Sequence, residues 1–102
     1  DCVIDLRKKS KTYGKQFKII LSDQNNLGLY VPEGFAHAYY SYSKENIIYY
    51  KLTNYYKPKF EGGINTLDKT LGIKWPGNIF LISKKDRELD TFKIFKKKFK
   101  YL

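Results

Sequence analysis

One stretch of the sequence decides how the chain folds: Val31-Pro32-Glu33-Gly34-Phe35-Ala36-His37-Ala38-Tyr39-Tyr40. Its proline, glutamate and glycine predict a turn that opens into a strand. Successive side chains of a strand point to opposite faces, so Phe35, His37 and Tyr39 share one face and their neighbours share the other. The predicted strand also carries the only histidine in the chain.

A second strand is predicted directly afterwards, at Glu45-Asn46-Ile47-Ile48-Tyr49-Tyr50-Lys51-Leu52, with Ser43 and Lys44 as the turn between the two. If Ser43 pairs with Lys44, His37 lies directly opposite Tyr50, within contact distance across an antiparallel pair. A slip of one residue would move the two side chains to opposite faces. The sequence therefore predicts a hairpin in one register and leaves the slipped register as the alternative.

Four more short strands are predicted, at residues 1–7, 15–21, 29–31 and 79–83. With turn signals between them, they favour an all-β sandwich or barrel. From Lys84 onward, apolar residues recur every three or four positions, which predicts a short C-terminal helix with a lysine-covered outer face. The paired glycines at 62 and 63 indicate backbone that passes close to another group or takes a positive φ.

The 102 residues suffice for one small domain or part of one. The formal net charge of +10 favours anionic partners, although a lysine-rich surface can also serve solubility alone. The single cysteine, Cys2, fits a reducing cytoplasm, and the sequence shows neither a membrane-span run nor a signal-peptide pattern. Because the chain begins within a predicted strand and holds no methionine, we expect a single domain, 1–102, that lacks its N-terminal part.

Few patterns in the sequence carry chemistry by themselves. Phosphate-binding glycine loops, zinc-ligand spacing and nucleophile elbows are absent, and one histidine cannot supply a multi-histidine metal site. What is left is a set of polar residues suited to the mouth of a barrel, where small ligands often bind. The set consists of His37, Tyr50, Tyr56, Glu61, Lys85 and Asp86. Each also has a purely structural interpretation, such as core packing, a turn residue or the solvated start of a helix.

Five motifs, in order along the chain, resemble those of the dTDP-4-dehydrorhamnose 3,5-epimerases. They are Val3-Ile4-Asp5-Leu6-Arg7-Lys8 with Ser10-Lys11-Thr12-Tyr13-Gly14, then Leu29-Tyr30-Val31-Pro32-Glu33-Gly34-Phe35-Ala36-His37, Tyr50-Lys51-Leu52-Thr53-Asn54-Tyr55-Tyr56, Leu71-Gly72-Ile73-Lys74-Trp75-Pro76 and Ile82-Ser83-Lys84-Lys85-Asp86. The resemblance is to the C-terminal portion of the family. The chain departs from the family's pattern at Ala38, where glycine is usual, at Lys11, where proline is usual, and in the basic tail from Thr91.

The resemblance implies a cupin fold, which is a double-stranded β-helix of jelly-roll type, in a cytoplasmic homodimer. It also implies an isomerase of dTDP-L-rhamnose biosynthesis that acts on a dTDP-sugar without a cofactor. The two exchanged protons flank a 4-keto group, so the reaction needs a base on one face of the sugar and an acid on the other. The family's base is a histidine in an Arg-Gly-Leu-His motif that this chain lacks. We therefore expect the chain alone to be inactive, although its parent protein is expected to be an epimerase.

The resemblance also implies roles for the six polar residues. Tyr50 matches the general acid, because a phenol stays protonated at neutral pH and can deliver a proton to an enolate. Asp86 matches the aspartate that orients the family's catalytic histidine. Substrate binding is implied for His37 near the sugar, Tyr56 stacked on thymine, and Glu61 and Lys85, with Lys85 on a phosphate or keto oxygen.

Two other interpretations stay open. The first is a related nucleotide-sugar cupin that epimerises one centre or only binds its ligand. The second comes from another class: basic strands with interleaved tyrosines that bind single-stranded nucleic acid through stacking and phosphate contacts. The ordered motifs favour the epimerase, so we expect a dTDP-sugar as partner, and no nucleic acid, membrane or metal.

Overall fold

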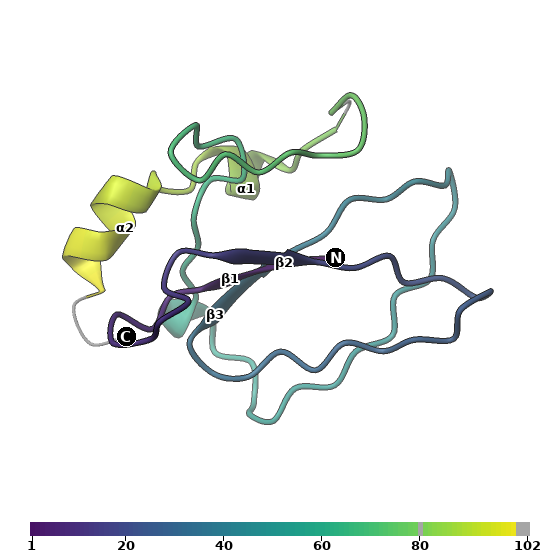
Figure 1. The fold of residues 1–102 in the computed structure, drawn as a ribbon, viewed down its shortest axis with the longest axis horizontal. Helices are drawn as coiled ribbons and strands as arrows, with labels where there is room; N and C mark the ends of the chain where they lie inside the picture. The colour runs from purple at the N-terminus through teal and green to yellow at the C-terminus, as the bar shows by residue number, and fades with distance from the viewer. Residues whose placement is uncertain (80, 100–102) are drawn as a thin grey trace.

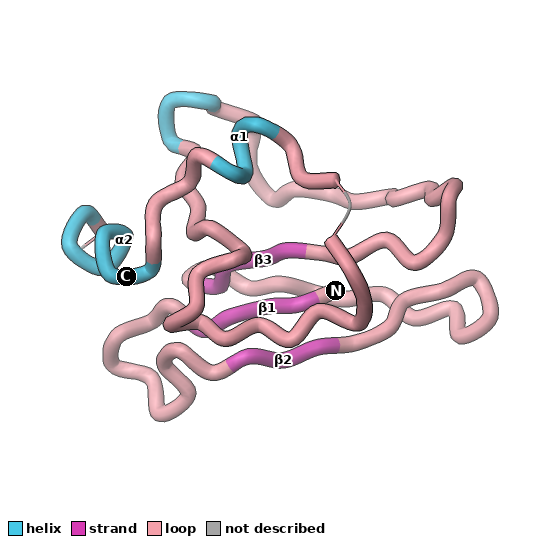
Figure 2. The backbone as a smooth tube through the Cα atoms, turned by 90° about the horizontal axis from the view of Figure 1, so that it is seen from above, coloured by secondary structure: helices cyan, strands magenta, loops and turns pink. Residues whose placement is uncertain are grey.

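The computed structural model describes residues 1–79 and 81–99 of the chain. Three short strands form one antiparallel sheet in the order β2-β1-β3. Strand β1 spans Cys2–Asp5, β2 spans Gln16–Lys18 and β3 spans Phe35–Ala38. Figures 1 and 2 show β1 between its two neighbours, with long strand-free stretches of chain around them.

The sheet follows the alternation predicted from the sequence. Ile4 lies opposite Ala36, and Val3 lies opposite His37. One face of β1 and the residue after it enter the core, which consists of Cys2, Ile4, Leu6, Ile64, Leu71 and Phe95. Full burial of such an aliphatic or aromatic side chain contributes about 1.5–3 kcal/mol. This small cluster therefore joins the sheet to the C-terminal half of the chain and leaves His37 on the opposite face.

The turn before β3 forms as predicted. Gly34 has a φ of +85°, and its carbonyl accepts a hydrogen bond of 2.9 Å from Leu6 N. A Cβ at this position would lie 2.6 Å from Arg7 Cγ. Both the left-handed backbone and the close approach of Arg7 therefore require glycine here.

A 3-10 turn and two short helices lie in the second half of the chain. The turn η1 spans Pro58–Phe60, α1 spans Lys84–Arg87 and α2 spans Phe92–Lys98. The helix predicted from Lys84 onward forms only in part, because residues 88–91 are not helical and separate α1 from α2. In α2, Phe95 is buried and the lysines are exposed, as predicted. Its first turn is capped twice, because Thr91 Oγ1 accepts from Ile94 N at 3.4 Å and the Asp68 carboxylate accepts from Phe92 N at 2.5 Å. In Figure 1, α2 lies beyond one end of the sheet.

The predicted strands at 29–31 and 45–52 do not form, nor do the described residues of the predicted strand at 79–83; Phe80 lies outside the described residues. The predicted hairpin is therefore wrong, because β3 pairs with β1 and His37 faces Val3 instead of Tyr50. The side chains of 45–52 are all exposed, with Ile47 100% accessible. A segment with no buried face has nothing that fixes its pairing register.

The described residues thus form a small sheet-rich fold with few helices, which agrees with the β class predicted from the sequence. A complete double-stranded β-helix is not formed by these residues, because their one sheet has three strands and is open. Within residues 1–79 and 81–99, no helix has the length and apolar character needed to cross a membrane.

Candidate functional site

His37 lies within β3, on the face of the sheet away from the core. Its ring contacts the Asp1 carboxylate, and its centroid lies 6.5 Å from that of Tyr39. Burial, and then the positive N-terminal ammonium, lower the pKa of His37. The neutral imidazole is therefore favoured, which has one donor and one acceptor nitrogen. Because 45% of the side chain is exposed, a polar ligand could reach it.

The carboxylate of Asp5 is buried and holds Arg7 against the turn that leads to His37. Neither Asp5 nor Arg7 was among the site residues predicted from the sequence. Asp5 accepts hydrogen bonds from Arg7 Nε and Arg7 Nη2 at 2.9 Å each and from Thr12 Oγ1 at 2.6 Å. Arg7 in turn covers the Phe35 ring, with Cζ 4.6 Å from the ring centroid. The hydrogen bonds from Arg7, more than any other cause, hold the pKa of Asp5 well below its usual range. The available signal was an acid and a base two residues apart, which share a face at the end of a strand.

Four of the six predicted site residues form a second group: Tyr56, Glu61, Lys85 and Asp86. Lys85 Nζ donates to Glu61 Oε2 at 2.5 Å. This hydrogen bond raises the pKa of Lys85, the charge of Glu61 adds to the effect, and Tyr56 and Asp86 act in the same direction. Lys85 therefore stays an ammonium. Its side chain is 66% exposed, so it can still receive an anionic ligand.

An open hollow of about 520 Å³ adjoins this group. It is lined by Leu52, Thr53, Asn54, Tyr55, Tyr56, Lys57, Phe60 and Glu61. Its volume falls within the usual range for small-ligand sites, roughly 300–1,000 Å³. The aromatic rings supply flat apolar surface, and Glu61 joins the hollow to Lys85. Such a combination suits a ligand that has a planar ring and a negatively charged group.

The glycines after η1 bring Glu61 to its place. A Cβ at Gly62 would lie 2.9 Å from the Phe99 ring, and a Cβ at Gly63 would lie 2.9 Å from Leu89 Cδ1. The predicted close approach of this backbone is therefore confirmed. It lets the chain around Glu61 lie against the segment that follows α1.

Helix α1 carries the other two members of the group. Ser83 caps it, since its hydroxyl oxygen accepts from Asp86 N at 3.1 Å. Asp86 lies in the first turn, where the helix dipole favours a negative charge, as the sequence predicts. Lys85 of this short helix thus contacts Glu61, and Asp86 lies next to it in the sequence.

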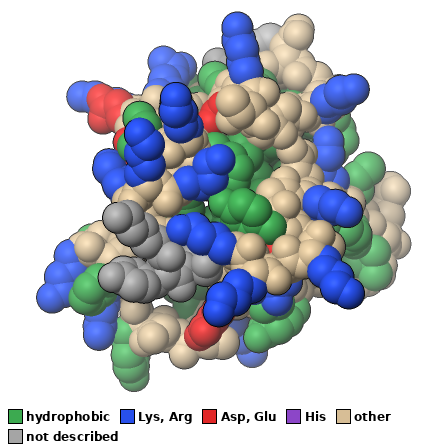
Figure 3. Space-filling model, turned by 60° about the vertical axis from the view of Figure 1, so that its left-hand side comes forward, with side chains coloured by type: hydrophobic (Ala, Val, Ile, Leu, Met, Phe, Trp, Pro, Cys, Tyr) green, Lys and Arg blue, Asp and Glu red, His purple; other side chains and the backbone are tan. Residues whose placement is uncertain are grey.

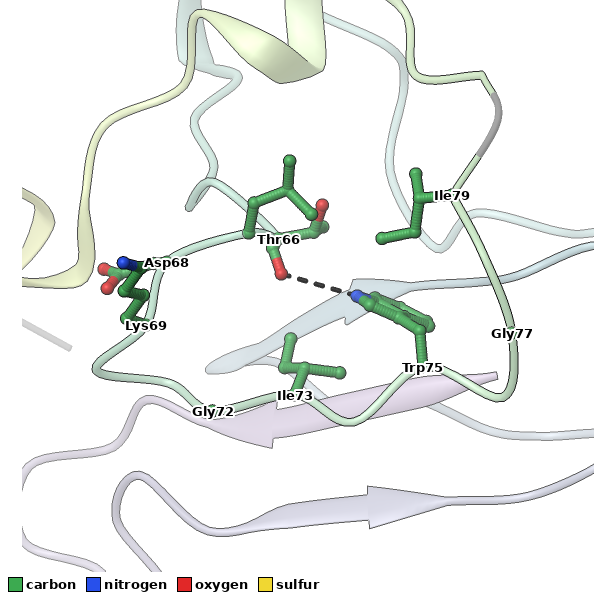
Figure 4. Close-up of a pocket in the computed structure, with 9 residues that line it drawn as sticks. Thr66, Asp68, Lys69, Gly72, Ile73, Trp75, Gly77 and Ile79 are labelled. Atoms are coloured by element: carbon green, nitrogen blue, oxygen red, sulfur yellow. Dashed lines mark hydrogen bonds between the residues drawn. The ribbon is translucent and has the colours of Figure 1, made fainter.

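A second hollow, of about 350 Å³, is lined by residues that lie between Thr66 and Ile79 in the sequence. Figure 4 shows Ile73, Trp75 and Ile79 around it, with the Trp75 ring nitrogen donating to the Thr66 carbonyl at 3.4 Å. None of the six predicted site residues lines it. Its one carboxylate, Asp68, already accepts from Phe92 N and from Thr70. The hollow beside Glu61 is therefore the better candidate for ligand binding.

Tyr50 does not line the hollow beside Glu61 and lies outside β3. It belongs to the strand-free stretch 45–52, with 72% of its side chain exposed. In the part of the chain that the structure describes, no hydrogen bond joins it to His37 or to Asp86. The described residues therefore bring Tyr56, Glu61 and Lys85 together, while Tyr50 remains outside that set.

Two other kinds of chemistry find no support among the described residues. No three histidine, cysteine, aspartate or glutamate side chains in ranges 1–79 and 81–99 are placed to hold a metal ion. Cys2 is buried in the core, and that burial raises the pKa of its thiol. A neutral, enclosed thiol is a poor nucleophile.

Comparison with known proteins places these residues in a family. Residues 1–93 match the family model described as dTDP-4-dehydrorhamnose 3,5-epimerase. A protein of that name from Methanothermobacter thermautotrophicus is 43% identical over 90 residues, which are 85% of this chain and 49% of the relative. One from Escherichia coli K12 is 39% identical over 92 residues, 89% of this chain and 50% of the relative. One from Salmonella typhimurium is 43% identical over 76 residues, 74% of this chain and 42% of the relative.

The chain therefore spans about half the length of the curated relatives that it matches. No solved structure matches it. The resemblance predicted from the five motifs is confirmed, and the match includes all six predicted site residues. It ends within α2, so that Lys96, Lys97 and Lys98 lie beyond it.

Proposed function

Because the chain belongs to the dTDP-4-dehydrorhamnose 3,5-epimerase family, we propose that it is part of an enzyme that inverts the two carbons flanking the keto group of dTDP-4-dehydro-6-deoxy-glucose. The observation that carries the proposal is that Tyr56 and Glu61 line one hollow and that Lys85 bonds to Glu61, all within the matched residues. Proton removal next to a carbonyl needs an acid and a base and no cofactor. The proposed setting is a cytoplasmic homodimer of dTDP-L-rhamnose biosynthesis.

The hollow beside Glu61 is the proposed dTDP subsite. Tyr56 stacks on the thymine ring, and the ammonium of Lys85 receives a phosphate or keto oxygen of the ligand. Glu61 holds that ammonium in place through its hydrogen bond of 2.5 Å. A charge-assisted contact of this kind is stronger than one between neutral groups. His37, on a separate face, is the proposed contact to the sugar.

The chemical step needs more than this chain. Tyr50 is the proposed general acid and Asp86 the proposed partner of a catalytic histidine, yet His37 is the only histidine here. The proposed base therefore belongs to a part of the protein outside these residues. In the same way, we propose that 1–102 is a single cupin domain that lacks its N-terminal part, and that the chain alone turns nothing over.

A titration of the chain with dTDP, followed by calorimetry, tests the binding proposal. Changing Tyr56→Ala is expected to weaken binding roughly 10- to 100-fold, because stacking of a base on an aromatic ring is worth about 1–3 kcal/mol. Tyr49→Ala is the matched control, since Tyr49 is exposed and does not line the hollow. Equal losses for the two variants, or no dTDP binding, would contradict the proposal.

Charge is tested by a second matched pair of variants. Lys85→Gln is expected to weaken dTDP binding and to flatten its salt dependence, because the removed ammonium is the one beside the hollow. Lys84→Gln removes an equal charge from the neighbouring position, whose side chain is 89% exposed, and is expected to leave affinity nearly unchanged. The same affinity for both variants would remove Lys85 from the proposed subsite.

The exposure of Tyr50 favours one alternative for this chain, which is a nucleotide-sugar cupin that binds without turnover. The two are separated by incubating the 4-keto sugar with the chain in heavy water. The proposal expects no deuterium in the sugar with this chain alone, and incorporation with the full-length parent. Incorporation by the isolated chain would show that a base is present within these residues.

A further inference from the structure

The net charge of the chain is concentrated in two segments. Residues 7–15 and 91–99 together contain nine of the twenty basic residues and none of the ten acidic ones. The other eighty-four residues therefore hold eleven basic and ten acidic residues, a net charge of only +1. Lysines that served solubility alone would be expected all over the surface. The charge of +10 thus belongs almost entirely to two short segments.

The fold brings the two segments together, although about eighty residues separate them in sequence. The rings of Tyr13 and Phe92 pack with centroids 6.1 Å apart. Figures 1 and 2 both place α2 and the loop between β1 and β2 at the same end of the molecule. The space-filling view of that side shows Lys and Arg side chains spread over it, with apolar side chains between them (Figure 3).

Most of these cations are available to a partner. Arg7 pairs with Asp5 and Lys98 with Asp90. The other seven are exposed and have no carboxylate within ion-pair distance among the described residues: Lys8, Lys9, Lys11, Lys15, Lys93, Lys96 and Lys97. The three in α2 are spaced i, i+3, i+4 and so form one stripe on the outer side of the helix.

We propose that this basic end, formed by residues 7–15 and α2, binds peripherally to an anionic lipid surface. Its unpaired cations are all lysines, which act as point charges, whereas bidentate phosphate recognition in nucleic acids favours arginine. Clusters of four to eight basic residues on an amphipathic helix are typical of acidic membrane surfaces. This proposed lipid binding differs from the expectation drawn from the sequence, which was that the chain has no membrane partner. It does not depend on the proposed epimerase function.

Aromatic and apolar side chains at this end favour lipid over nucleic acid. Single-stranded nucleic acid binds through bases stacked on free aromatic rings. Here the described rings are occupied, Tyr13 by Phe92 and Phe95 by Phe99, whose centroids are 4.5 Å apart. Ile94, next to the lysine stripe, is 44% exposed and can enter the headgroup region.

Sedimentation with vesicles tests the proposal. The chain is mixed with vesicles of phosphatidylcholine alone or of phosphatidylcholine with phosphatidylglycerol, at low and at physiological ionic strength. We expect binding only to the anionic vesicles, and weaker binding at the higher ionic strength. The triple variant Lys93→Gln, Lys96→Gln, Lys97→Gln is expected to bind roughly 10- to 100-fold more weakly.

The control variant removes three exposed lysines from elsewhere, Lys44→Gln, Lys51→Gln and Lys74→Gln, and is expected to retain most of the binding. A second variant in the loop, Lys8→Gln, Lys9→Gln, Lys11→Gln, should weaken binding as the α2 variant does, which guards against a loss caused by unfolding of α2. No binding to anionic vesicles, or equal losses in test and control variants, would overturn the proposal. Tighter binding to a single-stranded oligonucleotide through the same lysines would overturn it in favour of nucleic acid.

Discussion

At the scale of single residues, Asp5 is the most consequential polar group in the fold. Its carboxylate is buried, and it ties Arg7 and Thr12 to the end of β1. Because its pKa is lower in the folded than in the unfolded chain, the ionised carboxylate stabilises the fold above the ordinary carboxyl pKa of about 4. That stabilisation is lost as the pH falls below this value towards the folded pKa.

Replacing Asp5→Asn therefore has two expected results. The urea midpoint at neutral pH falls, because the amide cannot reproduce the charged contacts to Arg7. The decline of stability below about pH 4 also becomes shallower, since the titrating group is gone. Trp75 fluorescence in urea at a series of pH values measures both. Asp23→Asn, at an exposed loop position, is the control, and an equal effect there would contradict a special role for Asp5.

At the scale of elements, α2 is held by one buried side chain. With seven residues it is too short to be stable alone, so packing must hold it. Phe95 is 7% exposed and lies in the core with Ile64 and Leu71. Phe95→Ala is expected to cost about 3–5 kcal/mol, near the total stability of many small domains. Ile94→Ala, one residue away and 44% exposed, should cost far less in the same urea titration.

The N-terminus of α2 depends on a residue outside the helix. Asp68 accepts from Phe92 N and from Thr70 N, so it joins the loop after Asn65 to the helix start. Asp68→Ala is expected to lower the free energy of unfolding by about 1 kcal/mol, the usual loss for a helix cap. The control Asp23→Ala should change it little. A loss no larger than that of the control would show that Thr91 alone caps the helix.

The elements that could be predicted from sequence are those whose side-chain period matches their burial. β1 places Cys2 and Ile4 in the core, although all four of its residues are buried, and α2 places Phe92 and Phe95 inward at helical spacing. Residues 45–52 have a sequence equally suited to a strand, but a strand forms only where it can pair with another strand or pack against a core. The motifs likewise identified Glu61 and Lys85, whereas their direct contact depends on the close approach at Gly62 and Gly63, which the spacing of the motifs does not encode.

At the scale of the whole molecule, the chain divides into a packed part and an unpacked part. The packed part is the sheet with the C-terminal segments that cover it. The unpacked part contains the stretch 45–57, in which Tyr49, Tyr50 and Tyr55 are 82%, 72% and 90% exposed. Segments with few buried contacts open at low free-energy cost and are the preferred sites of proteolysis. The proposed dTDP subsite lies partly in this unpacked stretch.

Limited digestion with chymotrypsin reports on this division. The first cuts are expected after Tyr49, Tyr50 or Tyr55, and cuts at Phe35 and Phe95 should be slow because these residues lie in β3 and in the core. If dTDP binds beside Glu61, it should slow cleavage at Tyr55 and Tyr56, which line the hollow, more than at Tyr49, which does not. Mass spectrometry of the early fragments measures both effects. Early cleavage at Phe95 would mean that the packed part opens as readily as the rest, and equal protection of all tyrosines by dTDP would place the ligand elsewhere.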